Sequence, residues 1–125
     1  MWLPIGPWDL DANGSSGMLD IESVDDDGDL KGVVLGDNIL GFWDKDAQKI
    51  TFVRFSDPQA LSTYQIYTGY FWKEPKEPPT KSFPSGSFDA FLAGSFEAFQ
   101  GTGGVAHRHV FGWTAKKSVA VKKQA

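Results

Sequence analysis

The chain has 125 residues, a formal net charge of −4 and no cysteine. This length suits a single domain spanning residues 1–125, and the acidic balance argues against nucleic acid and anionic membranes as partners. The lack of cysteine excludes disulfides and thiolate metal sites. No apolar run approaches the ~20 residues of a membrane-spanning helix, and the N-terminus has no positively charged leader. We therefore expect a soluble protein, with the cytoplasm favoured.

The first half of the chain predicts short antiparallel strands, of which the hairpin at residues 16–35 is the clearest. Its apolar and polar residues alternate, and Asp27-Gly28 supplies residues that tolerate positive φ in a tight turn. A first strand begins at Trp8, and further strands follow at residues 39–43 and 50–55. The short links between them leave no room for the helical crossovers that parallel strands need.

The stretch from Thr63 to Lys73 is the longest and most aromatic predicted strand. Alternation places Tyr64, Ile66, Thr68, Tyr70 and Trp72 on one face, and Gln65, Tyr67, Gly69 and Phe71 on the other. A strand on the surface of a monomer has one polar face, whereas both faces here are apolar. Such a strand lies under an interface or under another covering segment, and we predict a homo-oligomer that forms through it.

The rest of the chain predicts a loop, two strands and a tail. Four prolines make residues 74–86 a long surface loop. Residues 88–99 fit either an amphipathic helix or a strand, and Gly94-Ser95 in the middle of the segment favours the strand. Residues 106–117 form the last strand, and residues 118–125 form a basic tail.

About eight strands in chain order predict an all-β fold, an eight-stranded antiparallel up-and-down β-barrel. Closing the sheet removes its edges, and nothing in the chain remains to cover two open sheet faces. A barrel of this size is filled by side chains or holds one small ligand.

Motifs at both ends of the chain point to a family. Gly6-Pro7-Trp8 lies at the first strand, Asn13-Gly14-Ser15 follows it, and DDGDLKG spans residues 26–32. Gly112-Trp113 and Lys116-Lys117 lie in the last strand. Together these motifs resemble the avidin-like β-barrels and, more broadly, the calycins, which include the lipocalins. The resemblance implies a barrel-closing contact in which Lys116 or Lys117 lies over the ring of Trp8.

The third strand departs from the avidin-like pattern. Biotin pockets of that family place a polar or aromatic residue there, whereas this chain has Val33, Val34 and Leu35. A buried polar ligand needs hydrogen-bonding partners, so the sequence does not predict biotin as the ligand.

Metal and catalytic motifs are weak in this chain. His107 and His109 share a strand face but lack a third ligand nearby, so two polar side chains at a barrel rim are favoured. Asp25, Asp27 and Asp29 surround a glycine but lack the acidic residue that ends a calcium loop, which favours a plain turn. No nucleophile elbow, phosphate loop or dinucleotide fingerprint occurs. We predict no enzyme, no metal and no cofactor.

Two functions remain, and they differ in whether the barrel is hollow. In the first, the barrel binds a compact, largely apolar small molecule inside; in the second, it is a packed structural or protein-interaction module that forms a homo-oligomer through residues 63–73. A ligand would contact aromatic walls and a few hydroxyl groups. The predicted ligand-binding residues are Trp43, Tyr67, Thr68, Trp72, Ser95, Phe96 and Trp113.

Overall fold

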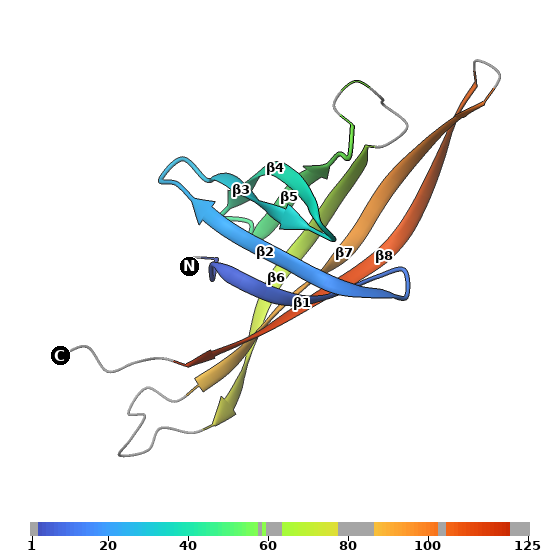
Figure 1. The fold of residues 1–125 in the computed structure, drawn as a ribbon. Helices are drawn as coiled ribbons and strands as arrows, with labels where there is room; N and C mark the ends of the chain where they lie inside the picture. Colours follow the sequence, from blue (N-terminus) through green and yellow to red (C-terminus); the bar gives the residue numbers. More distant parts are fainter. Residues whose placement is uncertain (1–2, 58, 60–63, 78–86, 103–104, 121–125) are drawn as a thin grey trace.

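The computed structural model describes residues 3–57, 59, 64–77, 87–102 and 105–120. Across this part of the chain the secondary structure is all β, and eight antiparallel strands close into a barrel in chain order (Figure 1). The predicted up-and-down barrel is thereby confirmed, and residues 88–99 form a strand. None of the described residues forms a helix long and apolar enough to cross a membrane. The strands are β1 (Gly6–Ala12), β2 (Ser15–Val24), β3 (Asp29–Val34), β4 (Asp37–Asp44), β5 (Lys49–Arg54), β6 (Gln65–Glu77), β7 (Ser87–Thr102) and β8 (Val105–Ala120).

Two of the hairpin turns are tight, but the one between β2 and β3 is not. Asn13-Gly14 and Leu35-Gly36 each have positive φ at both residues, as two-residue hairpin turns require. The predicted tight turn at Asp27-Gly28 is instead the end of a four-residue connection that begins at Asp25. The Asp25 carboxylate accepts hydrogen bonds from the backbone N–H groups of Asp27 and Asp29, both at 2.9 Å, and this stabilises the longer turn.

All three long strands extend further than the sequence predicted, and β7 spans Ser87–Thr102 where residues 88–99 were expected. β6 continues through Pro75 to Glu77, so the predicted loop at residues 74–86 begins too early. The N–H of Phe71 donates to the carbonyl of Gln48, on the side of β6 that faces β5. By alternation the N of Pro75 faces the same side, but β5 does not extend that far. Proline is tolerated on such a free edge because no hydrogen bond is lost there. β8 likewise runs to Ala120, three residues into the predicted tail.

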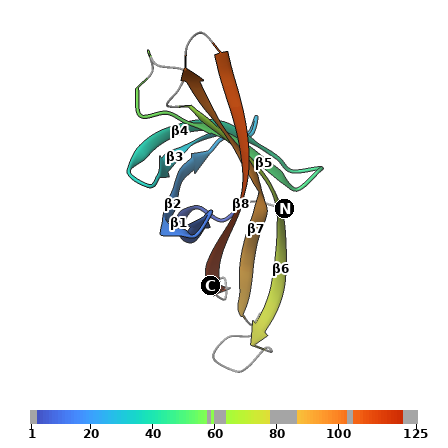
Figure 2. The same cartoon turned by 90° about the vertical axis from the view of Figure 1, so that its right-hand side faces the viewer.

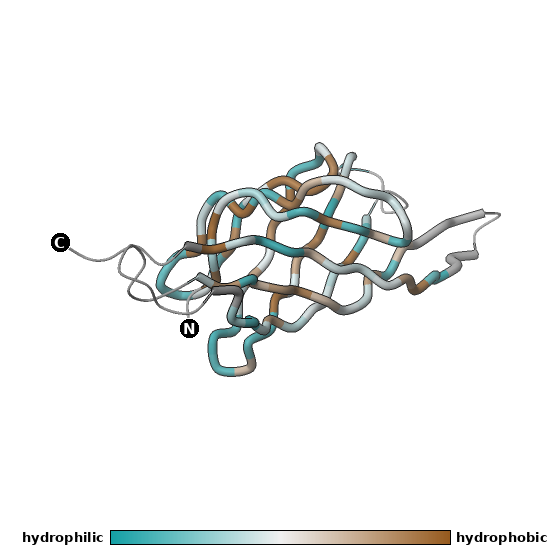
Figure 3. Tube along the Cα trace, turned by 90° about the horizontal axis from the view of Figure 1, so that it is seen from below, coloured by the Kyte–Doolittle hydropathy of each residue, from teal (hydrophilic) through white to brown (hydrophobic). Residues whose placement is uncertain are grey.

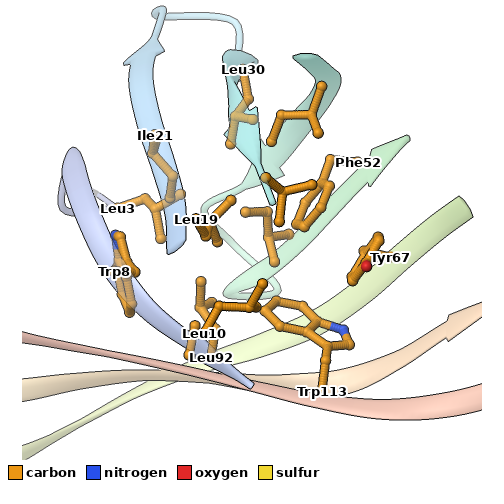
Figure 4. Close-up of a cluster of buried hydrophobic side chains, with 14 of the residues drawn as sticks. Leu3, Trp8, Leu10, Leu19, Ile21, Leu30, Phe52, Tyr67, Leu92 and Trp113 are labelled. Carbon is orange, nitrogen blue, oxygen red and sulfur yellow. The ribbon is translucent and has the colours of Figure 1, made fainter. Parts of the chain in front are cut away.

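The core lies inside the barrel, because alternate residues of every strand point inward. Figure 3 shows polar and apolar positions alternating along the strands, and Figure 4 shows the inward side chains meeting at the centre. None of the described residues that are buried is polar or charged. The buried cluster comprises Leu3, Trp8, Leu10, Ala12, Leu19, Ile21, Leu30, Val34, Ile39, Trp43, Ile50, Phe52, Tyr67, Phe71, Ala90, Leu92, Phe96, Trp113 and Ala115.

The three last strands are much longer than the others. Figure 2 shows β6, β7 and β8 extending beyond the short strands that complete the barrel. The seam that closes the barrel is short, because β1 pairs with β8 only from Asp9–Lys116 to Ala12–Trp113. Much of β8 therefore lies outside the barrel seam.

Candidate functional site

The interior of the barrel is the first candidate site, and aromatic rings fill one end of it. Tyr67 stacks between Phe52 and Phe96, with ring centroids 4.7 and 4.6 Å away. Trp113 meets Tyr67 edge to face at 5.6 Å. At the other end, Phe71 lies edge to face with Trp43 at 5.9 Å. These rings contact one another, as in a close-packed protein core.

The polar atoms of this interior are bonded to the protein itself. The indole N–H of Trp113 donates to the backbone carbonyls of Thr68 and Ser95 at 3.1 and 3.2 Å. The Tyr67 hydroxyl donates to Oε1 of Gln65 at 2.9 Å. Burial raises the pKa of Tyr67 above its ordinary value, and the hydrogen bond and charge of Arg54 offset part of that rise. No described buried side-chain polar atom lacks a hydrogen-bond partner.

The predicted ligand-binding residues divide between the two faces of the sheet. Trp43, Tyr67, Phe96 and Trp113 point inward and are buried. Thr68, Trp72 and Ser95 alternate with buried residues and point outward, so their side chains do not line the interior. The ring of Trp72 stacks on Phe91 instead, at 5.1 Å on the outer face. The structure therefore brings together four of the seven residues.

The two candidate barrel-closing lysines lie on opposite faces of β8. Lys117 lies near the first strand, where its Nζ donates to the carbonyl of Pro7 at 3.2 Å. Lys116 points outward, with its Nζ 5.8 Å from the ring centroid of Phe91. Trp8 is buried, and its indole N–H donates to the carbonyl of Pro4 at 3.0 Å. Of the two lysines, Lys117 is therefore the one next to the first strand, where the Pro7 carbonyl accepts its hydrogen bond.

A cavity of about 650 Å³ lies between the β2–β3 and β4–β5 turns. Phe42, Trp43 and Lys45 contribute to its walls, together with Asp25, Asp26, Asp27, Asp29, Asp44 and Asp46. The carboxylates of Asp25 and Asp44 accept backbone hydrogen bonds within their own turns. Among the described residues, no three acidic, histidine or cysteine side chains are grouped so as to hold a metal ion.

The histidine pair lies on β8, outside the barrel seam. His109 is exposed, and its ring lies 6.3 Å from that of Phe111. The side chain of His107 lies outside the described part of the structure.

The outer surface of β4, β5 and β6 is the second candidate site. Leu40 and Phe42 are each 55% exposed, and Tyr70 is 54% exposed. Strand register places Leu40 beside Val53 and Val53 beside Ile66, while Phe42 and Tyr70 lie in the next rows along the same strands. We call the outward side chains of Leu40, Phe42, Val53, Ile66, Tyr70 and Trp72 the β4–β6 face.

Two groups of residues in these sites were not predicted from the sequence. Phe52 and Phe71 complete the inner aromatic cluster, and their alternation with Thr51 and Trp72 is the signal for a shared inner face. Leu40 and Phe42 were missed as surface residues. The signal was the run of residues 39–43, which is apolar on both faces except for a glycine.

Because no family model, no curated protein and no solved structure matches this chain, its function is argued from the fold and its geometry.

Proposed function

We propose that this protein is a non-enzymatic interaction module with a packed barrel, and that it forms a homo-oligomer through the β4–β6 face. The observation that carries this proposal is the exposure of Leu40 and Phe42 on β4 and of Tyr70 and Trp72 on β6, on either side of the half-buried Val53 on β5. Exposed apolar patches of this kind mark interaction surfaces in soluble proteins.

The packing of the interior supports an outer site over an inner one. The aromatic side chains predicted as cavity walls are in mutual contact, and their N–H and O–H groups bond to the protein. A ligand at the barrel centre would have to displace these rings, at the cost of their packing. The outer face needs no such rearrangement.

The size of the β4–β6 face fits a subunit contact. An aromatic side chain buries ~150–250 Å² when fully covered, so the half-exposed Phe42, Tyr70 and Trp72 with their aliphatic neighbours offer roughly 500 Å² of apolar surface. This lies within the range of about 300–600 Å² for the largest apolar patch on a typical monomer, a patch that is often a functional surface. A standard interface buries about 800 Å² per partner, which the polar rim of the face would complete.

The second copy of the chain is the proposed occupant because the centre of the face is uncharged and its margin carries both signs of charge, with Lys31 beside Leu40, Asp29 beside Phe42 and Glu97 beside Ile66. Its centre carries Thr51 and Thr68 between the apolar side chains, and Lys49 lies at its margin with Nζ 5.9 Å from the Tyr70 ring centroid. Two such faces can meet without opposing like charges, as a two-fold symmetric contact requires.

Native mass spectrometry and sedimentation velocity test the proposal. The unaltered chain is expected at a multiple of its 13.7 kDa mass, without a bound small molecule. The double variant Phe42→Glu, Tyr70→Glu should lower that mass, because it places carboxylates in the apolar contact. The matched control is Met18→Glu, which changes a side chain of 53% exposure on β2 and should leave the mass unchanged. A monomeric unaltered protein, or one that retains a small molecule, would contradict the proposal.

Kinship with the avidin-like or calycin barrels is likewise a proposal. Its support is the closed eight-stranded barrel, the burial of Trp8 on the first strand and the bond from Lys117 to the Pro7 carbonyl. Homologues of intermediate sequence that retain Trp8 and Lys117 would support it, and homologues that vary freely at both positions would count against it.

A further inference from the structure

The first half of β8 has a free edge. β1 pairs with β8 over four residue pairs, and one further hydrogen bond joins Asn13 N to the carbonyl of Gly112 at 3.0 Å. In the part of the chain that the structure describes, no strand pairs with Val105–Phe111 on this side. On the other side of the hairpin, β6 pairs with β7 only as far as Ala98. The end of the β7–β8 hairpin is therefore a two-stranded ribbon that extends from the barrel (Figure 1).

Alternation along β8 tells which backbone groups face this free edge. The carbonyl of Gly112 points toward β1. The N–H and C=O of a residue point to one side of a strand, and those of the next residue to the other. The backbone groups of Val110 and Arg108 therefore point to the free edge, and those of His109 and Phe111 point to β7.

The free edge of β6 is protected, and this edge of β8 is not. Beyond Tyr70, the edge of β6 carries Lys73 and Glu74, a proline at position 75 without an N–H, and a bulge before Glu77. Prolines, charges and bulges are the devices that prevent edge pairing. The free edge of β8 has no proline, and the charge of Arg108 is neutralised by an ion pair with Glu97 at 2.6 Å. A two-stranded ribbon of this kind is only marginally stable in water without a further strand.

We propose that the free edge of β8 pairs antiparallel with the same edge of a second copy of this chain. This inference deepens the proposed function and rests on it, because it assigns a second contact within the homo-oligomer. The two-fold axis lies at His109, so that His109 is opposite the partner's His109. Arg108 is then opposite the partner's Val110, and Val110 is opposite the partner's Arg108. Each of these two Arg108–Val110 pairs exchanges two backbone hydrogen bonds. Centring the axis on Arg108 would place two guanidinium groups opposite each other, which is unfavourable.

Disulfide trapping tests both the contact and its register. His109 occupies a non-hydrogen-bonded position at the new edge, where paired Cα atoms lie about 4.5 Å apart, within the range for a disulfide. Because the chain has no cysteine, His109→Cys introduces a single thiol. Air oxidation should convert this variant to a covalent dimer at least about tenfold faster than Met18→Cys, an exposed control on β2. Equal rates for the two variants would overturn the proposal.

A backbone substitution checks the same contact without cysteine. Val110→Pro removes an N–H that points to the free edge and leaves the bonds from β8 to β7 in place, so it should lower the oligomer mass. Val110→Thr retains the N–H and should not. The near-ultraviolet circular dichroism of the buried tryptophans Trp8, Trp43 and Trp113 reports whether the barrel of each variant is intact. An intact Val110→Pro variant with unchanged mass would contradict the edge contact.

The two proposals fail in different ways. If Phe42→Glu, Tyr70→Glu lowers the mass but His109→Cys does not form the dimer, the edge contact is wrong and the β4–β6 face stands. If His109→Cys forms the dimer while the face variant keeps its full mass, the face is wrong and the edge contact stands.

Discussion

The indole ring of Trp113 lies directly over Gly69. A Cβ atom built on Gly69 would lie 2.5 Å from Cζ2 of that ring, closer than any real contact. The glycine therefore leaves the space in which the Trp113 ring packs, and the ring's N–H reaches the carbonyls of Thr68 and Ser95 on β6 and β7. One glycine on β6 thus sets how the largest side chain of β8 fills the barrel.

Gly69→Ala should destabilise the barrel by about 1–3 kcal/mol, the usual cost of forcing an additional methyl group into a packed core. Urea denaturation followed by tryptophan fluorescence measures this free energy. Gly112→Ala is the matched control, because the nearest atom to its added Cβ is a carbonyl oxygen 3.9 Å away. Equal stabilities for the two variants would show that the Trp113 ring adapts without cost.

Tyr67→Phe should change how stability depends on pH. Burial raises the pKa of Tyr67 in the folded state. Its contribution to the free energy of unfolding is therefore fully present below the unfolded-state pKa of ~10, and it is lost as pH rises through the folded-state pKa. The free energy of unfolding of the unaltered protein should therefore fall more steeply above about pH 10 than that of the variant. At neutral pH the variant should lose about 1 kcal/mol with the hydrogen bond to Gln65. Equal slopes for the two proteins would show that Tyr67 does not carry this pH dependence.

Gly28→Ala should destabilise the protein more than Gly14→Ala does. Both glycines have positive φ, +90° and +84°, so both variants incur backbone strain of about 1 kcal/mol. A Cβ on Gly28 would also overlap the carbonyl oxygen of Trp43, whereas a Cβ on Gly14 has nothing within 4 Å. Thermal unfolding of the two variants measures the difference. Similar melting temperatures would mean that the β4–β5 turn moves aside without cost.

Pro75→Thr should increase self-association through the free edge of β6 beyond Tyr70. Threonine restores an N–H on the side where β5 has ended, and so creates a site for another strand. Light scattering as a function of protein concentration measures the effect. Glu74→Gln is the control, because its backbone N–H points toward β7 by alternation. Identical scattering from both variants would mean that Pro75 does not protect this edge.

Local chemistry accounts for the parts of the fold that could be predicted. Alternation around Trp8 and in the run ending at Val34 defines strands, and Asn13-Gly14 forms a turn because these two residues tolerate positive φ. The extent of β6 could not be predicted in this way. Pro75 is compatible with a strand only because the neighbouring strand ends before it, and that depends on pairing with residues far away in the chain.

The candidate site shows the same division. The sequence by itself determined that β6 has two apolar faces and that aromatic residues dominate the late strands. Only the tertiary structure decided which face is inside, because alternation separates two faces without saying which one the closed barrel covers. The inner face carries Tyr67, Gly69 and Phe71, since the glycine there accommodates the ring of Trp113. Trp72 is consequently on the outside, where it is 43% exposed and belongs to the surface that we propose as the subunit contact.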